Sequence, residues 1–258
     1  MEPIYSTKIT KFKSGEKFEV DDILVREVMI DIILNDEKIG SVMATPVDEK
    51  ALVYGYLISE GLILNDIKSI ESKFINDFHT EIYIEAKQND ENLARFKTSS
   101  VIVSGCGSVR SANLNLDLIN AKKLNNNIKF SKSLILSRMA MFYTQCDLYE
   151  QTGCVHTAKL FVNDDEFYIG EDIAQHNTID KALGKARLNG ANLENSFLMV
   201  SGRLSSEMVA KAVMHGVPAL ISRTAPTYLG VEIARKFNLT LCGFARNQNI
   251  NVYSGALF

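Results

Sequence analysis

Short apolar runs alternate with amphipathic segments in the last third of the chain, and this alternation limits the folds that the chain can adopt. Residues 197–200, 219–221 and 239–244 have the length and composition of buried strands. Residues 205–215 and 226–237 lie between them and predict helices, and Pro226 suits a first helical turn. A β-α-β-α-β order predicts a parallel sheet covered by helices, which places the chain in the α/β class.

An arginine follows or ends each of these three predicted strands: Arg203, Arg223 and Arg246. The carboxyl ends of parallel strands meet at the edge where open α/β sheets bind ligands. Guanidinium groups match the geometry of phosphate, and nearby helix N-termini add partial positive charge. We therefore expect a phosphate or pyrophosphate pocket at this edge, with Ser201 and Ser222 beside the first two arginines. The alternative is that the arginines form ordinary surface ion pairs.

The rest of the chain predicts two domains, an N-terminal α+β domain over residues 1–125 and an α/β domain over residues 126–258. In the first, turn residues at 35–37 separate two strands of a hairpin, and Gly61 follows a predicted helix. The second begins after Lys132 with an amphipathic helix of about four turns. The expected elements are strands at 26–35, 38–45 and 78–86, a helix at 48–60, a connection at 113–127, a strand hairpin at 155–162 and 167–173, and a helix at 178–188.

The segment EDIAQHNTIDK, residues 171–181, places acidic, histidine and asparagine side chains between two apolar segments. This pattern predicts a polar site at the end of a strand. His176 and Asp172 are its candidate ligand-binding residues, and either His176 or His156 has the chemistry of a general acid or base. The alternative for each histidine is a hydrogen-bonded structural role.

Cys106 lies in the loop SGCGS, where flanking glycines permit tight backbone conformations and leave the sulfur accessible. The reactive form of a cysteine is the thiolate, which a nearby cation such as Arg110 would favour. The alternative is a small buried side chain, which fits Cys146 and Cys242 better. The four cysteines of a chain without an apolar leader are expected to be reduced.

Composition excludes several classes of protein. A length of 258 residues with 46% hydrophobic content allows a full core, and the net charge of −3 without a long basic run argues against nucleic-acid binding. No apolar stretch has the roughly 20 residues that a membrane span needs, so we expect a cytoplasmic protein. His79-Thr80-Glu81 matches half of the zinc deaminase signature, but no P-C-x-x-C follows, so no metal site is predicted.

Several longer motifs occur along the chain in a fixed order: MATP (43–46), YGYLISEGLI (54–63), SGCG (104–107), TGCVHTAKL (152–160), EDIAQHNTIDKALG (171–184), VSGRLSSEMV (200–209), VPALISRTAPT (217–227), and LCGFAR (241–246) with NVYS (251–254). Over most of the chain they resemble the FdhD family, the sulfurtransferase accessory proteins of formate dehydrogenase. The resemblance implies a cytidine-deaminase-like three-layer α/β domain without zinc, a smaller α+β domain, and a homodimer.

The resemblance also implies a function and its partners. A cysteine desulfurase would supply persulfide sulfur to Cys106, and the sulfur would pass to the molybdenum or tungsten of a bis(molybdopterin guanine dinucleotide) cofactor bound for the catalytic subunit of formate dehydrogenase. The family's cofactor-binding segment, which would contact the guanine nucleotide part, maps onto Phe244, Ala245, Arg246, Asn247, Gln248 and Asn249.

One position departs from the family pattern. The family commonly has a C-x-x-C pair in this loop, whereas here Val109 follows Cys106 at the second position. One thiolate suffices to carry a persulfide, and we hypothesise that Cys154 serves as the resolving thiol. Two alternatives stay open: a cofactor-binding chaperone without sulfur transfer, and a deaminase-like hydrolase.

Overall fold

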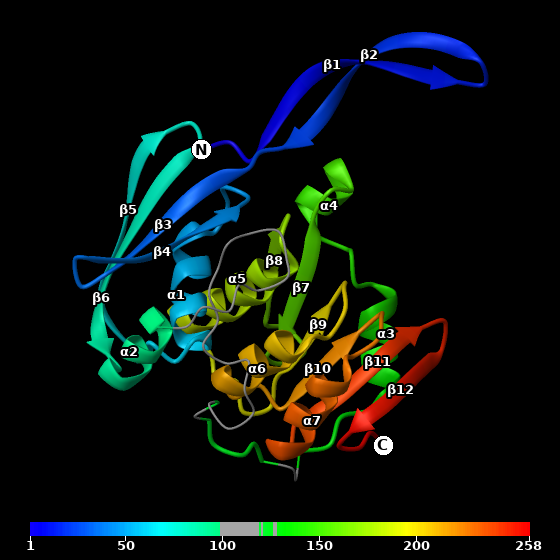
Figure 1. Ribbon diagram of the computed structural model, residues 1–258. Helices are drawn as coiled ribbons and strands as arrows, with labels where there is room; N and C mark the ends of the chain where they lie inside the picture. Colours follow the sequence, from blue (N-terminus) through cyan, green and yellow to red (C-terminus); the bar gives the residue numbers. More distant parts are fainter. Residues whose placement is uncertain (99–118, 120, 126–127) are drawn as a thin grey trace.

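A six-stranded sheet forms the centre of the second half of the chain (Figure 1). The computed structural model describes residues 1–98, 119, 121–125 and 128–258. The strand order is β12-β11-β10-β9-β7-β8, and β9, β10 and β11 run parallel, as the predicted β-α-β-α-β order requires. The strands are β7 (His156–Phe161), β8 (Phe167–Asp172), β9 (Phe197–Val200), β10 (Ala219–Ser222), β11 (Thr240–Arg246) and β12 (Asn249–Ser254).

Helices cover both faces of this sheet. Successive apolar side chains of its strands point to opposite faces, so each face has a core that helices must cover. Leu198 and Leu220 pack into the core under α5 (Gln175–Leu188), α6 (Ser206–His215) and α7 (Tyr228–Lys236). Their neighbours Met199 and Ile221 point the other way, into the core with α3 (Lys132–Ala140). The predicted α/β class is confirmed, and the second half of the chain has three layers.

The N-terminal half has its own sheet, in the order β4-β3-β6-β5, with its own core. The predicted β3–β4 hairpin turns at Asn35 and Asp36, which both have positive φ, as a type I′ turn requires. The predicted boundary between the domains, at residues 125 and 126, stays a prediction. The elements are β3 (Val28–Leu34), β4 (Glu37–Ala44), α1 (Glu49–Ser59), β5 (Ile63–Asn76), β6 (His79–Gln88) and α2 (Asp90–Thr98).

Helix α1 joins the two halves. Its sequence is apolar on all sides, which is typical of a fully buried helix, and residues 51–59 are all buried between the N-terminal sheet and α5. The approach to α5 is close because each helix contributes a glycine at the crossing. A Cβ at Gly55 would lie 2.1 Å from the carbonyl oxygen of Asp180, and one at Gly184 would lie 1.9 Å from that of Ala51.

Two features differ from the sequence expectations. The predicted four-turn helix after Lys132 is two shorter helices. Helix α3 ends at Ala140, turns occupy residues 141–145 with Gln145 at a φ of 66°, and α4 (Asp147–Thr152) begins after Cys146. The helix predicted from Pro226 begins later, with Thr227 as its N-cap. In the ranges that the structure describes, no helix is both long enough and apolar enough to span a membrane.

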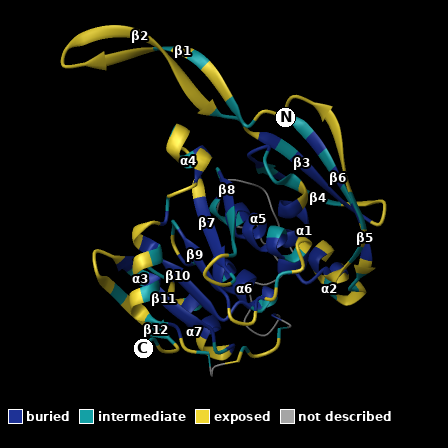
Figure 2. Ribbon diagram, turned by 180° about the vertical axis from the view of Figure 1, so that it is seen from behind, coloured by how far each residue is buried: buried dark blue, intermediate teal, exposed yellow. Residues whose placement is uncertain are grey.

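A two-stranded arm precedes the first sheet and was not predicted. Strands β1 (Ile4–Lys13) and β2 (Glu16–Val25) pair along their whole length and project from the body above α4 (Figure 1). Most of their residues are exposed and none is buried (Figure 2). Charged residues interrupt the apolar alternation in both strands, so the sequence pattern did not mark them as part of a core.

The close crossing of α1 and α5 generates a prediction. Alanine at position 184 forces a methyl group into the carbonyl of Ala51, so we expect Gly184→Ala to lower the free energy of unfolding by about 1–3 kcal/mol. This is the opposite of the usual gain for Gly→Ala inside a helix. Urea unfolding measures the change. In the control, Gly40→Ala, the new methyl meets no atom within 4 Å, so a loss as large there would contradict the packing argument.

Candidate functional site

The carboxyl ends of β10 and β11 hold two of the three predicted arginines around one cavity. Arg223 follows β10 and Arg246 ends β11, and both line a cavity of about 270 Å³ against α3. Arg223 also lies over the ring of Tyr143, at 5.5 Å from its centroid. The structure thus brings two of the three strand-end arginines to one cavity, and their role as phosphate ligands stays a prediction. The other lining residues are Leu136, Met139, Ala140, Asn247 and Gln248.

The segment 244–249 forms the tight connection between β11 and β12. Phe244, Asn247 and Gln248 all have positive φ, and Asn247 and Gln248 turn the chain back into the antiparallel β12. Arg246 lies 6.0 Å from the centroid of the Phe244 ring. Residues 246–249 are exposed, whereas Ala245 is fully buried in the core beside α3. The turn therefore presents a guanidinium, two amides and backbone groups to solvent at the mouth of the cavity.

The third arginine lies outside this cavity. Arg203 follows β9 and is exposed, and its carbonyl accepts a hydrogen bond from Gln175 of α5 at 2.8 Å. The two predicted serines hold the neighbouring loops. Ser201 Oγ accepts from the backbone N–H of Thr157 at 3.1 Å and contacts His156 Nδ1 at 3.2 Å. The fully buried Ser222 donates to the carbonyl of Gly202 at 2.5 Å.

Asp172 lies inside the protein rather than at the surface of the site. Its carboxylate pairs with Lys181 at 2.6 Å, and both side chains are 0% exposed. Oδ2 also accepts from the backbone N–H and the hydroxyl of Thr45, both at 3.0 Å. Oδ1 accepts from the backbone N–H of Ala174 and from Asn177, both at 2.9 Å. The carboxylate is saturated by protein groups, and it ties β4 of the first sheet to β8 and α5.

His176 begins α5 and contacts a residue that sequence reasoning missed. Its Nδ1 lies 3.1 Å from Oε2 of Glu207 on α6, and the two side chains are 24% and 8% exposed. Burial raises the pKa of Glu207 to about 7 and lowers the pKa of His176 to about 3. The sequence feature that could have identified Glu207 is its position near the start of an amphipathic helix, on the face that carries the buried residues.

The cysteines divide as the sequence predicted where they are described. Cys146 and Cys242 are both buried, and burial raises the pKa of their thiols to about 11 and about 12. Both are therefore protonated at neutral pH and unreactive. Cys154 is an exposed free thiol two residues before His156. Cys106, Val109 and Arg110 lie outside the described residues, so the proposed role of Cys154 stays a prediction.

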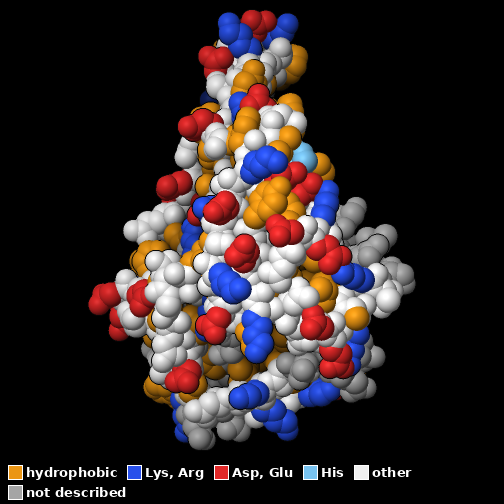
Figure 3. Space-filling view, turned by 90° about the vertical axis from the view of Figure 1, so that its left-hand side faces the viewer, with side chains coloured by type: hydrophobic (Ala, Val, Ile, Leu, Met, Phe, Trp, Pro, Cys, Tyr) orange, Lys and Arg blue, Asp and Glu red, His pale blue; other side chains and the backbone are white. Residues whose placement is uncertain are grey.

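Asp31, His79 and Glu81 form the one group of potential metal ligands among the described residues, with ligand atoms within 4.8 Å of one another. The ammonium groups of Lys38 and Lys73 already lie 2.6 Å from Asp31 and 3.1 Å from Glu81. Two cations on the carboxylates fit an ion-pair network better than a metal site. Acidic and basic side chains are also interspersed over this side of the molecule (Figure 3).

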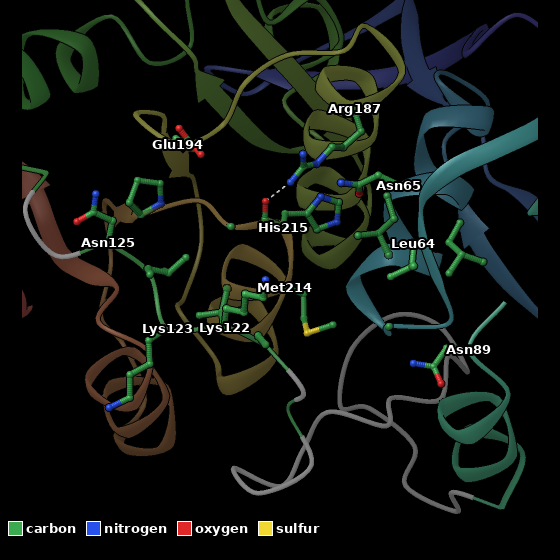
Figure 4. Close-up of a pocket in the computed structure, with 18 of the residues that line it drawn as sticks. Leu64, Asn65, Asn89, Lys122, Lys123, Asn125, Arg187, Glu194, Met214 and His215 are labelled. Carbon is green, nitrogen blue, oxygen red and sulfur yellow. Dashed lines mark hydrogen bonds between the residues drawn. The ribbon is translucent and has the colours of Figure 1, made fainter. Parts of the chain in front are cut away.

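A second, larger cavity of about 890 Å³ lies between the two halves of the chain (Figure 4), and the sequence did not predict it. Three helix ends meet there: Ile58 near the end of α1, Arg187 of α5 and His215 of α6. The guanidinium of Arg187 donates to the carbonyl of His215, which satisfies the end of α6. Because β10 begins at Ala219, just after the lining residue Pro218, this cavity is at the opposite edge of the sheet from the arginines.

The buried Asp172–Lys181 pair generates a prediction. Lys181→Met leaves the buried carboxylate without its cation, so we expect a loss of about 3–5 kcal/mol in the free energy of unfolding. Adding Asp172→Asn removes the unpaired charge and should recover part of the loss. Chemical denaturation of the single and double variants measures both. Glu91→Gln, which breaks the exposed pair with Arg95, is the control and should cost under about 0.5 kcal/mol.

Comparison with known proteins finds relatives that belong to one family. The model of the FdhD/NarQ family matches residues 25–257. A sulfur carrier protein FdhD from Wolinella succinogenes is 39% identical over 238 residues, which cover 92% of this chain and 82% of the relative. One of the same name from Bacillus subtilis is 32% identical, with 95% of this chain and 94% of the relative covered.

A solved structure shares the architecture. The crystal structure of a proposed formate dehydrogenase accessory protein from Desulfotalea psychrophila superposes with a TM-score of 0.76. The two chains are 27% identical, and the superposition covers 98% of each. The similarity therefore includes the N-terminal half, both sheets and the edge that carries the arginines.

Proposed function

This chain belongs to the FdhD/NarQ family, and from that premise we propose that it is a sulfur carrier protein that serves the maturation of formate dehydrogenase. The names of its relatives support this role. The relatives are named sulfur carrier proteins, and their similarity covers nearly the whole length of this chain. The observation that carries the ligand-binding part of the proposal is the cavity between Arg223 and Arg246 at the carboxyl edge of the parallel strands.

The sulfur step is a thiol–persulfide exchange on Cys106. The Cys106 thiolate attacks the terminal sulfur of a persulfide on a cysteine desulfurase, so that a new S–S bond forms and the donor cysteine leaves as a thiolate. This exchange involves no net oxidation. In the next step the terminal sulfur becomes a sulfido ligand of the metal, the metal supplies the two electrons that the sulfur needs, and Cys106 leaves as a thiolate.

The acceptor is molybdenum or tungsten in a bis(molybdopterin guanine dinucleotide) cofactor, which is cargo rather than a resident group. Its pyrophosphate groups suit the guanidinium groups of Arg223 and Arg246. The exposed turn after Arg246 offers the amides of Asn247 and Gln248 for the edge of a guanine base. Phosphate and base recognition would thus come from neighbouring strand ends, as in other open α/β sheets.

The proposal extends to the setting in which the protein works. It would be a cytoplasmic homodimer that receives sulfur from a cysteine desulfurase and delivers the cofactor to the catalytic subunit of formate dehydrogenase. No zinc takes part.

A second candidate function is a cofactor-binding chaperone that does not transfer sulfur. The observation in its favour is Val109, which stands at the second position of the family's C-x-x-C pair. In this case the cavity and its arginines keep their role, and Cys106 is dispensable.

Ligand binding at the arginines is testable with guanosine diphosphate as the probe. Arg223→Ala or Arg246→Ala removes a charge-assisted hydrogen-bond donor from the cavity, so we expect the dissociation constant to rise roughly tenfold or more. Isothermal titration calorimetry measures it. Arg235→Ala is the matched control, because Arg235 lies on the exposed side of α7 and pairs with Glu232. Equal losses in all three variants would contradict the assignment.

Sulfur carriage is testable by mass spectrometry after incubation with a cysteine desulfurase and cysteine. We expect an extra sulfur on the Cys106 peptide of the wild type, none in Cys106→Ala, and continued labelling of Cys106 in Cys154→Ala. In cells that produce Cys106→Ala, the absence of the extra sulfur should be accompanied by loss of formate dehydrogenase activity. A wild type that stays unlabelled by a competent donor, with activity kept in Cys106→Ala, would favour the chaperone function instead.

A further inference from the structure

Both arginines of the cavity lie over an aromatic ring. Arg246 lies over Phe244, which belongs to the same turn. Arg223 lies over Tyr143, which comes from the turns between α3 and α4, with 5.5 Å between Cζ and the ring centroid. A guanidinium group stacks on an aromatic face because the planar cation is attracted to the electron-rich side of the ring. The ring at Arg223 therefore comes from a distant segment of the chain, and its position depends on how that segment is held.

A second tyrosine stacks on this ring. Tyr149 of α4 lies with 4.0 Å between its ring centroid and that of Tyr143, and the ring planes differ by 13°. Tyr143 packs against the core on the α3 face of the sheet, and this core includes Met139, which lines the cavity. Burial raises the pKa of Tyr143, so its ring is uncharged at neutral pH. Tyr143 and Tyr149, the tyrosine platform, thus lie on the same side of the sheet as the cavity.

The turn that carries Tyr143 is anchored on both sides of this residue. The side chain of Phe142 is buried in the core next to α3. The buried ammonium group of Lys159 on β7 donates to the carbonyl of Thr144. The carbonyl of Tyr143 accepts from the backbone N–H of Cys146 at 3.1 Å. These contacts fix the backbone from which the Tyr143 ring extends.

Glu171 holds the helix that carries Tyr149. Its carboxylate accepts from the backbone N–H of Leu148 at 3.2 Å and from that of Tyr149 at 2.8 Å. These N–H groups belong to the first turn of α4, where no partner exists within the helix and where Cys146 provides no side-chain cap. Asp172, the next residue of β8, binds Lys181 of α5 on the other face of the sheet. The first acidic residue of the segment 171–181 therefore supports the platform.

Contacts within the protein occupy only part of the guanidinium group of Arg223. Among the described residues, its hydrogen bond is a long one, 3.5 Å from Nη1 to the carbonyl of Met139 near the end of α3. A guanidinium group has five N–H donors, so most of them stay available to a ligand in the cavity. Stacking on Tyr143 orients the group without using these donors.

We propose that the tyrosine platform orients Arg223 for the ligand, which makes Tyr143 and Tyr149 positioning residues of the cavity. A flexible arginine side chain loses rotamer freedom when it binds a ligand, and orientation before binding reduces this loss. A stacked guanidinium group keeps its charge and its donors, so an anionic group such as a phosphate meets a partner that is already in place. The inference rests on the proposed function only for the identity of the ligand.

Binding of guanosine diphosphate, measured by isothermal titration calorimetry, tests the platform. We expect Tyr143→Leu to raise the dissociation constant roughly two- to tenfold, because the ligand must then order Arg223. Tyr149→Leu should weaken binding in the same direction, whereas Tyr143→Phe keeps the ring face and should bind like the wild type. Tyr228→Leu changes an exposed tyrosine of α7 and is the matched control, with no loss expected.

A double variant separates positioning from a general loss of structure. Because Tyr143 is proposed to act through Arg223, Tyr143→Leu should cause no further loss when it is added to Arg223→Ala. Affinity of Tyr143→Leu equal to or higher than that of the wild type would overturn the inference. A loss in the Arg223→Ala background as large as in the wild-type background would overturn it as well.

Proton NMR of the arginine side chains tests the position of Arg223 without a ligand. The ring current of Tyr143 displaces the side-chain signals of Arg223, and Arg223→Lys identifies these signals by their loss. We expect the displacement to persist in Tyr143→Phe and to disappear in Tyr143→Leu. Arg223 signals that are identical in the wild type and in Tyr143→Leu would contradict the platform. Absence of nucleotide binding with the ring-current displacement intact would instead count against the proposed function.

Discussion

The buried ion pair between Asp172 and Lys181 is the interaction on which the rest of the structure depends. Both side chains are fully buried, and the carboxylate holds Thr45 at the end of the first sheet through its backbone and its hydroxyl. Charges of this kind are tolerated in a protein interior only when they are paired and hydrogen-bonded. One carboxylate thereby joins the end of β4, the end of β8 and the first turns of α5, and it fixes how the two halves of the chain meet.

Helix α5 supplies most of the contacts at the junction of the two halves, and it also carries His176, one of the residues predicted to bind the ligand. Its face toward α1 carries Asp180, Lys181 and Gly184, which supply an ion pair to α6, the central ion pair and the close helix crossing. Its first turn carries His176, which lies 3.1 Å from Glu207 of α6 and is not among the residues that line the arginine cavity.

The sequence predicted the parts of the fold and site that depend on local patterns. The three parallel strands, their arginines and the β3–β4 hairpin follow from short-range apolar runs and turn residues. The burial of Asp172 and the Glu207–His176 contact did not, because each depends on partners from distant segments, such as Thr45, 127 residues away from Asp172. The break between α3 and α4 was not predicted either, because it includes Gln145 in a left-handed conformation that non-glycine residues seldom adopt.

A crystal structure of the protein with guanosine diphosphate would test the central claim most directly. The account predicts that electron density for the phosphates lies between Arg223 and Arg246, with the base beside the turn at Asn247 and Gln248. Density for the nucleotide in the cavity at the opposite edge of the sheet, beside Arg187 and His215, would contradict it. In that case the strand-end arginines would be surface groups, and the ligand site would lie where the three helix ends converge.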